Sequence, residues 1–420
     1  MRIKSIVSCS IGNVLEWYDF GLFAIFSPLF SRLFFPEEDP EAALIMTFGV
    51  LAIGFLCRPI GALIFGYLGD KRGRVKTIRL SILMISIPTL LIGLIPTYAS
   101  IHLWAPIILV LIRIWQGISL GGEYSGNLIY LTESAPTKWR ATITSLAGTG
   151  ANLGILLAAL VSTACSSIFS DAFFQSAGWR IPYILSGLLS LGIYFGRLKM
   201  QETEAFSHLR ATHQLAENPI KTVFKYNKRE ILRTIGMVCM GSIFYYLSFI
   251  YMPTFLMLSM HLSLTHASAL MTCYIGSMIF LVPIAGYICD QVSRRKMLLF
   301  NVFFIITITV CGFHFLLGTF SYSVLWFLAL ITIASSLEQA TTCVAVVENF
   351  PLPARYTGLS LGYNVGNAIF GGTAAFVCEL LITKVHFLLA PAFYIVISAM
   401  VTGLVVFFFV PDTRGVNLNE

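Results

Sequence analysis

The stretch GYLGDKRGRVK at residues 66–76 recurs as GYICDQVSRRK at residues 286–296, so that Asp70 and Asp290 occupy matching positions. Two further pairs of stretches repeat in the same order: TESAPTKWR (132–140) with VENFPLPAR (347–355), and FSPLF (26–30) with YMPTF (251–255). The offset between the copies is nearly constant. This pattern indicates that the chain is a duplication of one unit.

The composition is that of a membrane protein. Hydrophobic residues make up 57% of the 420 positions and charged residues only 11%, a balance that water-soluble domains of this size do not usually show. Runs of about 20 apolar residues, the length that crosses a bilayer as a helix, recur along the chain. We predict twelve such spans, at residues 9–34, 42–68, 77–96, 103–131, 141–169, 181–198, 234–258, 266–289, 297–317, 322–347, 357–382 and 388–410.

The basic residues predict the orientation of these spans, because cytoplasmic loops keep an excess of Lys and Arg. Most of the 27 Lys and Arg residues fall on one side of the predicted map. We therefore expect both termini to be cytoplasmic, as an even number of spans requires. This bias accounts for the net charge of +7 without a nucleic-acid partner. The nine cysteines and seven histidines are scattered, and we expect no metal and no cofactor.

Together the spans and the duplication predict an all-α membrane protein with two pseudo-symmetric six-helix bundles. We expect the N-terminal bundle at residues 1–198, a cytoplasmic linker at 199–233 and the C-terminal bundle at 234–420. Parallel repeats of this kind place a binding site at the midplane, between halves that rock against each other. The architecture favours a transporter, and we expect it to be a monomer in the bilayer.

Three charged residues fall near the middle of predicted spans: Asp19, Arg58 and Arg113. A charge at mid-bilayer costs at least about 2.5 to 3.5 kcal/mol, so such residues face the protein interior and are functional candidates. Glu16 shares one face of its helix with Asp19, because residues three apart are neighbours on a helix. Paired carboxylates in a low dielectric can exchange a proton near neutral pH. Arg113 offers a planar fork for Asp19 or for a substrate carboxylate.

A buried structural ion pair that fixes helices in register is the alternative explanation for these charges. Two acids in other spans are further candidates for coupling or substrate binding: Glu123, in SLGGEYSG (119–126), and Glu338. Aromatic side chains supply faces that can hold a quaternary ammonium by cation–π attraction, although aromatics are also common at membrane interfaces. The candidates for such a cage are Trp17, Tyr18, Trp115, Tyr124, Tyr245, Tyr246 and Tyr251.

The repeated loops suggest a gate at the cytoplasmic face. Asp70 and Asp290 each precede a basic cluster. The acids and arginines of the repeated stretches 132–140 and 347–355 flank short loops within reach of these aspartates. Pairing of these charges would hold the cytoplasmic side closed; the alternative is that they only satisfy the positive-inside rule. The predicted gate residues are Asp70, Arg74, Glu133, Arg140, Asp290, Arg294, Glu348 and Arg355.

These stretches also carry a resemblance. The loop GYLGDKRGR resembles the loop motif of the major facilitator superfamily. NVLEWYDFGLF (13–23), RIWQGISLGGEYSG (113–126) and GWRIPY (178–183) are similar to its metabolite:proton symporters, and YYLSFIYMPTFL (245–256) is most similar to the proline/betaine symporters.

The resemblance implies a twelve-helix facilitator fold, alternating access and proton-driven import across a bacterial inner membrane. It also implies that Gln116 and Tyr124 join Glu16, Asp19, Arg58, Arg113 and Glu123 in the coupling and substrate region. We expect a zwitterion such as proline or glycine betaine, with a di- or tricarboxylate (oxoglutarate, citrate) or shikimate as the alternative. A non-transporting sensor is less favoured. An enzyme is not expected, because GDKRGRVKT (69–77) is not a phosphate-binding GxxxxGK[ST] loop.

Overall fold

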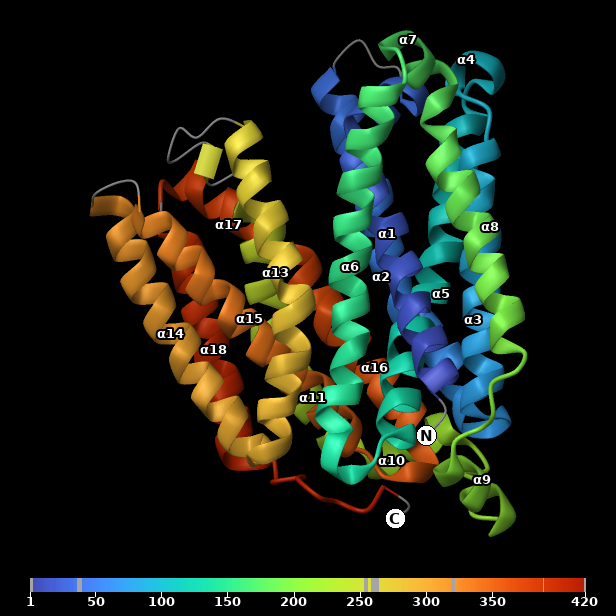
Figure 1. Cartoon of the computed structure of the whole chain (residues 1–420), viewed down its shortest axis with the longest axis vertical. Coiled ribbons are helices and arrows are strands. Elements are labelled where there is room, and N and C mark those ends of the chain that lie inside the picture. Colours follow the sequence, from blue (N-terminus) through green and yellow to red (C-terminus); the bar gives the residue numbers. More distant parts are fainter. Residues whose placement is uncertain are drawn as a thin grey trace.

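The computed structural model describes residues 3–35, 40–252, 256–257, 264–318, 322–387 and 389–418. Figure 1 shows a helical molecule with two bundles side by side. Helices are expected here, because a chain in hydrocarbon must satisfy its own backbone hydrogen bonds. The first half supplies one bundle and the second half supplies the other.

Six long helices form the first bundle. They are α1 (Ile3–Phe34), α2 (Pro40–Arg72), α3 (Arg74–Leu94), α5 (Trp104–Ser134), α6 (Arg140–Ile168) and α8 (Arg180–Arg197). The short helices α4 (Tyr98–Ile101) and α7 (Asp171–Phe173) lie at the end of this bundle that is upper in Figure 1. Two short helices, α9 (Glu204–Ala211) and α10 (Pro219–Tyr226), follow α8 at the lower end.

The second bundle repeats this plan. It contains α11 (Lys228–Tyr246), α13 (Leu264–Gln291), α14 (Arg294–Gly318), α15 (Tyr322–Glu348), α16 (Arg355–Gly366) with α17 (Gly372–Val385), and α18 (Ala390–Phe409). Two π-helical turns interrupt it: η3 (Leu247–Tyr251) follows α11, and η5 (Asn367–Gly371) joins α16 to α17. π-helical turns inside helices are frequent at functional sites.

The helices agree with the predicted spans in number and order. In the described residues, ten helical segments are long and apolar enough to cross a membrane, and α1 and α8 complete the six long helices of the first bundle. Several helices begin at charged residues outside the predicted spans. α3 begins at Arg74, and α11 begins at Lys228 rather than near residue 234. Hydropathy ends a span at the first charges, whereas the backbone helix continues beyond the hydrocarbon.

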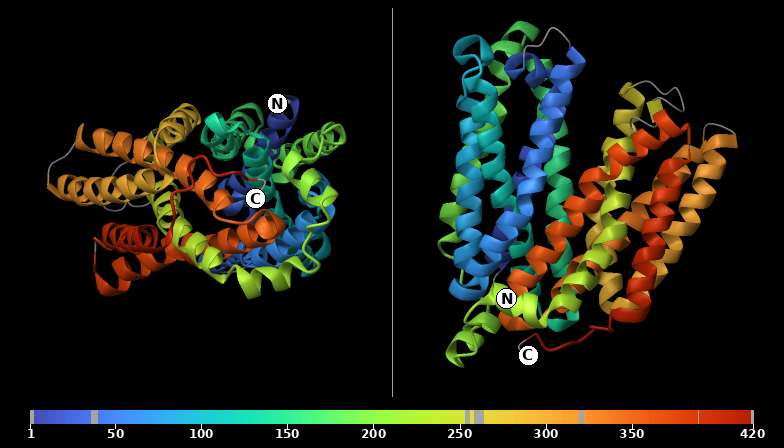
Figure 2. Two further views of the ribbon diagram at one scale, coloured as in Figure 1. Left: turned by 90° about the horizontal axis from the view of Figure 1, so that it is seen from below. Right: turned by 180° about the vertical axis from the view of Figure 1, so that it is seen from behind.

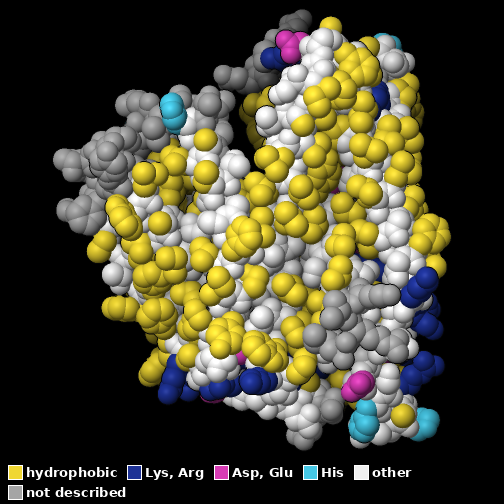
Figure 3. Space-filling model, viewed as in Figure 1, with side chains coloured by type: hydrophobic (Ala, Val, Ile, Leu, Met, Phe, Trp, Pro, Cys, Tyr) yellow, Lys and Arg dark blue, Asp and Glu magenta, His cyan; other side chains and the backbone are white. Residues whose placement is uncertain are grey.

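The two bundles meet at the end of the molecule that holds both termini, and they diverge toward the other end (Figures 1 and 2). We call the first the basic end, because the Lys and Arg side chains gather there in the space-filling view (Figure 3), and the second the opposite end. Between the bundles, α2 packs against α16 and α6 packs against α13. These two crossings relate the halves by the same pseudo-symmetry as the sequence repeat.

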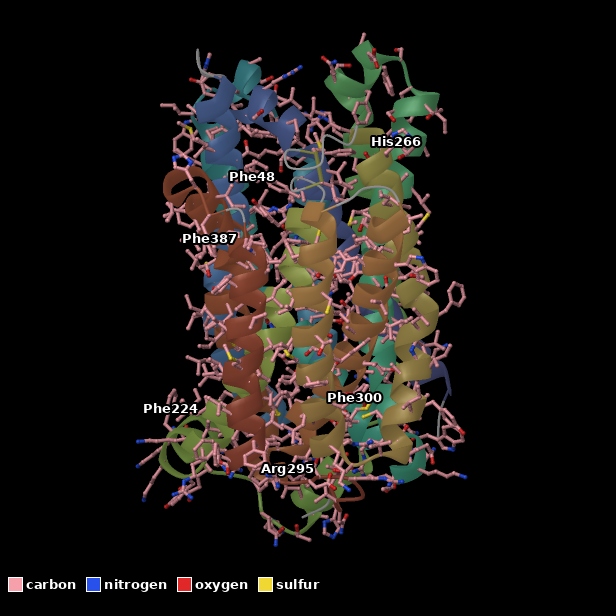
Figure 4. All side chains as sticks on the ribbon, turned by 90° about the vertical axis from the view of Figure 1, so that its left-hand side faces the viewer. Phe48, Phe224, His266, Arg295, Phe300 and Phe387 are labelled. Atoms are coloured by element: carbon pink, nitrogen blue, oxygen red, sulfur yellow. The ribbon has the colours of Figure 1, made fainter. Side chains whose placement is uncertain are left out.

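Hydrophobic side chains cover the flanks of the molecule between the two ends (Figure 3). Phe280 is 72% exposed and Phe303 is 69% exposed, which is the expected state of side chains that face lipid. In Figure 4, Arg295 lies at the basic end and Phe300, five residues further along α14, lies above it. The flanks therefore have the character of a lipid-facing belt.

Glycines allow the closest helix crossing in the first bundle, between α2 and α5. A Cβ added at Gly117 would collide with the backbone of Gly54, and one at Gly121 with the backbone of Arg58 and Ala62. Such small residues let helix backbones approach closely. This crossing fixes the relative position of Arg58 on α2 and the polar residues of α5.

We predict that Gly121→Val lowers the melting temperature of the detergent-solubilised protein, because the new side chain meets backbone atoms that cannot move aside. Overpacking of this kind costs about 1–3 kcal/mol. The matched control is Gly192→Val on α8, where an added Cβ has no neighbour within 4 Å. Equal melting temperatures for the two variants would show that the α2–α5 crossing is not tightly constrained.

Candidate functional site

A cavity lies between the two bundles, and both contribute to its wall. It encloses about 550 Å³ of space, including its mouth. The lining residues come from α1, α5 and α6 of the first half and from α11, α15 and α16 with η5 of the second. They are Trp17, Tyr124, Ala151, Val238, Gly241, Ser242, Tyr245, Tyr246, Glu338, Gln339, Thr342, Cys343, Tyr363 and Asn367.

Aromatic rings form much of this wall. The Trp17 ring meets the rings of Tyr124 and Tyr245 edge-on, with centroids 6.3 Å apart in each case. Tyr363 stacks on Tyr124 at 5.2 Å. Of the seven aromatic residues predicted as cage candidates, Trp17, Tyr124, Tyr245 and Tyr246 line the cavity. The structure places the other three, Tyr18, Trp115 and Tyr251, outside the lining.

Glu338 is the acid in the cavity wall. It is buried, with 7% of its surface exposed, and its Oε1 atom has no hydrogen-bond partner in the described part of the chain. No ion pair among the described residues involves it. Gly241 of α11 lies directly against the carboxylate, where a Cβ would collide with it. A buried carboxylate without a cation next to aromatic faces is suited to a positively charged ligand group.

Arg58 lies beside this cavity, at the interface between the halves. Its Nε donates a hydrogen bond to Oδ1 of Asn364 at 3.0 Å, and its guanidinium carbon lies 5.5 Å from the centre of the Phe55 ring. The side chain is buried, and no carboxylate of the described residues lies within ion-pair distance of it. Glu16 lies near enough to interact with Arg58 by Coulomb attraction but does not form an ion pair with it. The Oε2 atom of Glu16 has no partner among the described residues.

Asp19 and Arg113 form a buried ion pair within the first bundle, with Asp19 Oδ2 and Arg113 Nη1 3.0 Å apart. Gln116 donates from Nε2 to the same Asp19 oxygen at 3.0 Å and to Oγ1 of Thr89 at 2.9 Å. The Phe23 ring packs 3.7 Å from the guanidinium carbon. Asp19 Oδ1 and the Nε and Nη2 atoms of Arg113 have no partner in the described region. Both residues of the pair therefore keep hydrogen-bonding atoms that have no partner among the described residues.

A second, smaller hollow of about 240 Å³ opens onto this ion pair. Its lining includes Phe20, Phe55, Arg113 and Gln116. The rings of Phe20 and Phe55 pack edge-on at 5.1 Å. Phe20 also contacts Trp17, and Phe55 contacts Tyr246, so the two phenylalanines separate this hollow from the main cavity.

Glu123 occupies a different environment. It is fully buried inside the first bundle, where Arg197 of α8 donates to Oε1 at 2.6 Å and to Oε2 at 3.0 Å. Asn127 and Ser81 also donate to its carboxylate. The structure thus gives this acid a complete set of partners and places it outside the cavity lining. Its part in coupling or substrate binding stays a prediction, made from its charge inside a span and from the resemblance.

The predicted gate charges gather at the basic end, where Asp70 bridges the two halves. Its carboxylate accepts hydrogen bonds from the backbone N–H groups of Tyr356 and Thr357 at 3.1 and 2.9 Å, and from Oγ1 of Thr357 at 2.8 Å. These donors form the N-terminus of α16. The exposed N–H groups and the dipole of a helix N-terminus stabilise a carboxylate at this position.

Asp290 makes the pseudo-symmetric contact in the opposite direction. It lies at the end of α13 and accepts from the N–H groups of Ala141 and Thr142 at 2.8 and 2.9 Å, and from Oγ1 of Thr142 at 2.8 Å. These donors form the N-terminus of α6 in the first half. Each half therefore inserts an aspartate against a helix N-terminus of the other.

Arginine and glutamate residues surround both aspartates. Arg74 pairs with Asp70 at 2.8 Å and with Glu133 at 3.4 Å, and Arg355 of the second half pairs with Glu133 at 2.9 Å. The second copy repeats the network: Arg294 pairs with Asp290 at 3.2 Å and with Glu348 at 3.4 Å, and Arg140 of the first half pairs with Glu348 at 3.0 Å. We call these eight residues the basic-end latch.

Two segments add contacts at the basic end, the first to the latch and the second to the start of α3. The backbone carbonyls of Val416 and Leu418 accept hydrogen bonds from Arg140 and Arg355 at 3.0 and 3.1 Å. Glu202, just after α8, accepts from the N–H of Val75 at the start of α3. Burial raises the pKa of Glu202, against the lowering effect of the N–H bond from Thr203 and of the charge on Arg74.

Comparisons with known proteins place this architecture. Residues 5–420 match the profile of a family described as "sugar (and other) transporter". The solved structure of the major facilitator superfamily proton:xylose symporter XylE bound to 6-bromo-6-deoxy-D-glucose superposes with a TM-score of 0.80 at 18% identity, covering 99% of this chain and 97% of that one. The chain belongs to the major facilitator superfamily.

Curated relatives of this transporter are more similar to it in sequence than the solved structure of XylE is. The chain is 33% identical over 414 residues to the proline/betaine transporter of Salmonella typhimurium, covering 96% of this chain and 82% of that protein. The proline/betaine transporter of Escherichia coli K12 is 32% identical over the same coverage. Against the inward-open structure of XylE from E. coli, at 16% identity, the TM-score is 0.66, covering 99% of this chain and 98% of that one. The relatives are transporters, and this chain is a membrane transporter and not an enzyme.

Sequence reasoning missed several residues of this region. Arg197, near the end of the predicted span 181–198, is not among the predicted site residues, but it is fully buried against Glu123. Tyr363, Asn364 and Gln339 contribute to the cavity or to the contact between the halves. The available signal was the polar run LGYNVGN (361–367) inside an otherwise apolar span.

We predict that Asp70→Asn opens the basic end of this transporter more often, because the amide is uncharged and its nitrogen cannot accept the hydrogen bonds that one carboxylate oxygen now accepts from α16. Hydrogen bonds to a charged group are each worth about 1.5–3 kcal/mol. The native Cys289, fully buried at the latch, reports the opening: with the other cysteines replaced, its reaction with a maleimide should become about tenfold faster.

The matched control for this measurement is Glu230→Gln. Glu230 pairs with Arg233 on the same helix, so its loss breaks no contact between the halves. If Asp70→Asn left the reactivity of Cys289 as low as the control does, the contact between Asp70 and α16 would not hold the basic end closed.

Proposed function

We propose that this transporter imports a small zwitterion, proline or glycine betaine, together with protons across a bacterial cytoplasmic membrane. The basic end faces the cytoplasm in this proposal, as its excess of Lys and Arg predicts. The observation that carries the proposal is the cavity between the halves. It presents tyrosine and tryptophan faces and the unpaired carboxylate of Glu338, and the latch closes the end below it.

The cavity suits a solute with both signs of charge. Glu338 and the aromatic faces stabilise an ammonium group through Coulomb and cation–π attraction. Arg58, with no carboxylate partner among the described residues, supplies a cation beside the cavity for the carboxylate of the same solute. A di- or tricarboxylate needs further free cations, but Arg113 is already paired with Asp19. The names of the curated relatives agree with a zwitterion.

The Asp19–Arg113 pair is the proposed proton-coupling element. Protonation of Asp19 removes its charge and weakens its hold on Arg113. The free Oδ1 atom of Asp19 and the hollow beside Arg113 give a proton a place to bind. Gln116 contacts both residues, so a change at Asp19 is transmitted along α5. Alternating closure of the two ends then makes one transport cycle.

Uptake into proteoliposomes with an imposed proton gradient, acidic outside, tests the function. We expect labelled proline or betaine to accumulate, and oxoglutarate and citrate not to accumulate. Glu338→Gln should weaken proline and betaine uptake at least about tenfold, since a Coulomb interaction with a nearby cation is lost. The matched control is the exposed acid Glu217, changed to Gln.

Other outcomes of this assay separate the alternatives. Accumulation of oxoglutarate or citrate in place of the zwitterions would contradict the proposed substrate. Binding without any exchange of labelled solute would indicate a sensor rather than a carrier.

Asp19→Asn should abolish uphill uptake while sparing exchange of solute down its gradient, because the variant cannot gain or lose the proton but keeps a polar contact to Arg113. The two activities are measured in the same proteoliposomes, with Asp171→Asn on the short helix α7 as the control. Undiminished uphill accumulation by Asp19→Asn would remove this residue from the coupling role.

A further inference from the structure

Helices α2 and α16, from opposite halves, are joined at two levels. At the basic end Asp70 accepts from the N-terminus of α16, including Thr357. Deeper in the molecule, Arg58 of α2 donates from Nε to Asn364 of α16 at 3.0 Å. Asn364 lies seven residues beyond Thr357, about 10 Å along the helix. One helix therefore carries both a latch contact and a contact with the arginine beside the cavity.

Asn364 is held in a single orientation by the first half and by its own helix. Its Nδ2 donates to the carbonyl of Gly121 on α5 at 3.0 Å and to the carbonyl of Ser360 at 2.8 Å. Both acceptors require the nitrogen, so the oxygen must point toward Arg58. The amide is fully buried, and it serves as a three-way contact between α2, α5 and α16.

This contact satisfies a hydrogen bond of Arg58 without neutralising its charge. A buried guanidinium with only a neutral acceptor is stabilised further by an anion. A carboxylate binds arginine through two parallel N–H bonds, and the side-on arrangement uses Nε together with one Nη. Nε is the atom that Asn364 occupies. A carboxylate that binds side-on must therefore displace the asparagine.

The cavity lies next to this position. Asn367, one turn beyond Asn364 on the same face, lines the cavity. Tyr246 also lines it, and its ring packs 6.0 Å from that of Phe55, on which the Arg58 guanidinium rests. The contact between Arg58 and Asn364 thus lies immediately below the cavity, on the side toward the latch.

The pseudo-symmetric crossing, between α6 and α13, has no contact of this kind at the matching positions. Arg58 corresponds to Met278 at the offset that relates Asp70 to Asp290, and Asn364 corresponds to Thr149 at the offset that relates Arg355 to Arg140. Thr149 donates to Ser145 within its own helix. The latch is duplicated in both halves, but the charged contact beneath the cavity is present in one.

We propose that Asn364 couples occupation of the cavity to release of the basic-end latch. In the empty transporter it holds Arg58 across the interface and keeps α16 against α2. The carboxylate of the bound solute takes Arg58 Nε from Asn364, which leaves Asp70 as the residue of α2 that still forms hydrogen bonds with α16 in the described part of the chain. This inference rests on the proposed function, because it requires a solute with a carboxylate.

Maleimide reaction at Cys289, with the other cysteines replaced, tests the coupling in the detergent-solubilised protein. Asn364→Ala should speed the reaction about tenfold without solute, and proline or betaine should then add little. Asn364→Asp supplies a fixed carboxylate to Arg58. It should weaken solute binding at least about tenfold, because the fixed carboxylate competes with that of the solute for Arg58. Its reactivity at Cys289 does not report the coupling, since it also loses the N–H donor to Gly121 and Ser360.

The matched control is Asn301→Ala. Asn301 is a fully buried asparagine on α14 whose amide has no partner among the described residues, so its loss breaks no contact between the halves. Size-exclusion chromatography establishes that each variant is folded. Unchanged solute-free reactivity in Asn364→Ala, together with stimulation by solute, overturns the coupling role.

The reactivity of Cys289 without solute tests the coupling role of Asn364 independently of the substrate assignment. If Asn364→Ala accelerates the reaction but neither proline nor betaine binds, the contact restrains the latch as proposed and the substrate assignment is wrong. If the zwitterions are transported but Asn364→Ala reacts as the control does, the function holds and the coupling role falls.

Discussion

Two aspartates hold the halves of this transporter together, each against the N-terminus of a helix from the other half. Asp70 binds the start of α16, and Asp290 binds the start of α6. The carboxylates satisfy N–H groups that a helix cannot satisfy itself and lie at the positive end of its dipole. These contacts join the two halves at the basic end, below the central cavity.

The duplication explains the latch but not the chemistry at the centre. Both halves carry the same aspartate, arginine and glutamate at the basic end, and both pair across the interface. At mid-depth the copies differ: the first half holds the Asp19–Arg113 pair and Arg58, while the second contributes Glu338 and most of the cavity tyrosines. As we propose, the duplicated contacts govern the motion of the halves, and the residues that differ between the halves supply the recognition and the coupling to protons.

Sequence predicted the architecture well because its signals are periodic or repeated. Hydropathy located the spans, and the repeat located the latch acids. Contacts between distant residues were harder to predict, since a pattern along one helix does not identify its partner. Arg197 lies at the end of a predicted span, where a basic residue is common, but it pairs with Glu123, which lies 74 positions earlier. Asn364 had no charge to mark it, and its partner Arg58 lies in the other half. Tyr18 and Trp115 share the aromatic character of Trp17 but do not line the cavity.

The most direct test measures both ends of the molecule at once by electron paramagnetic resonance, with two pairs of spin labels. One pair joins the exposed positions Ser167 and Cys311 toward the opposite end, and the other joins Lys138 and Lys296 at the basic end. We predict that proline or betaine, added with acidification, shortens the first distance and lengthens the second. If both distances stay constant, or change in the same direction, the halves do not alternate about the central cavity and the account fails.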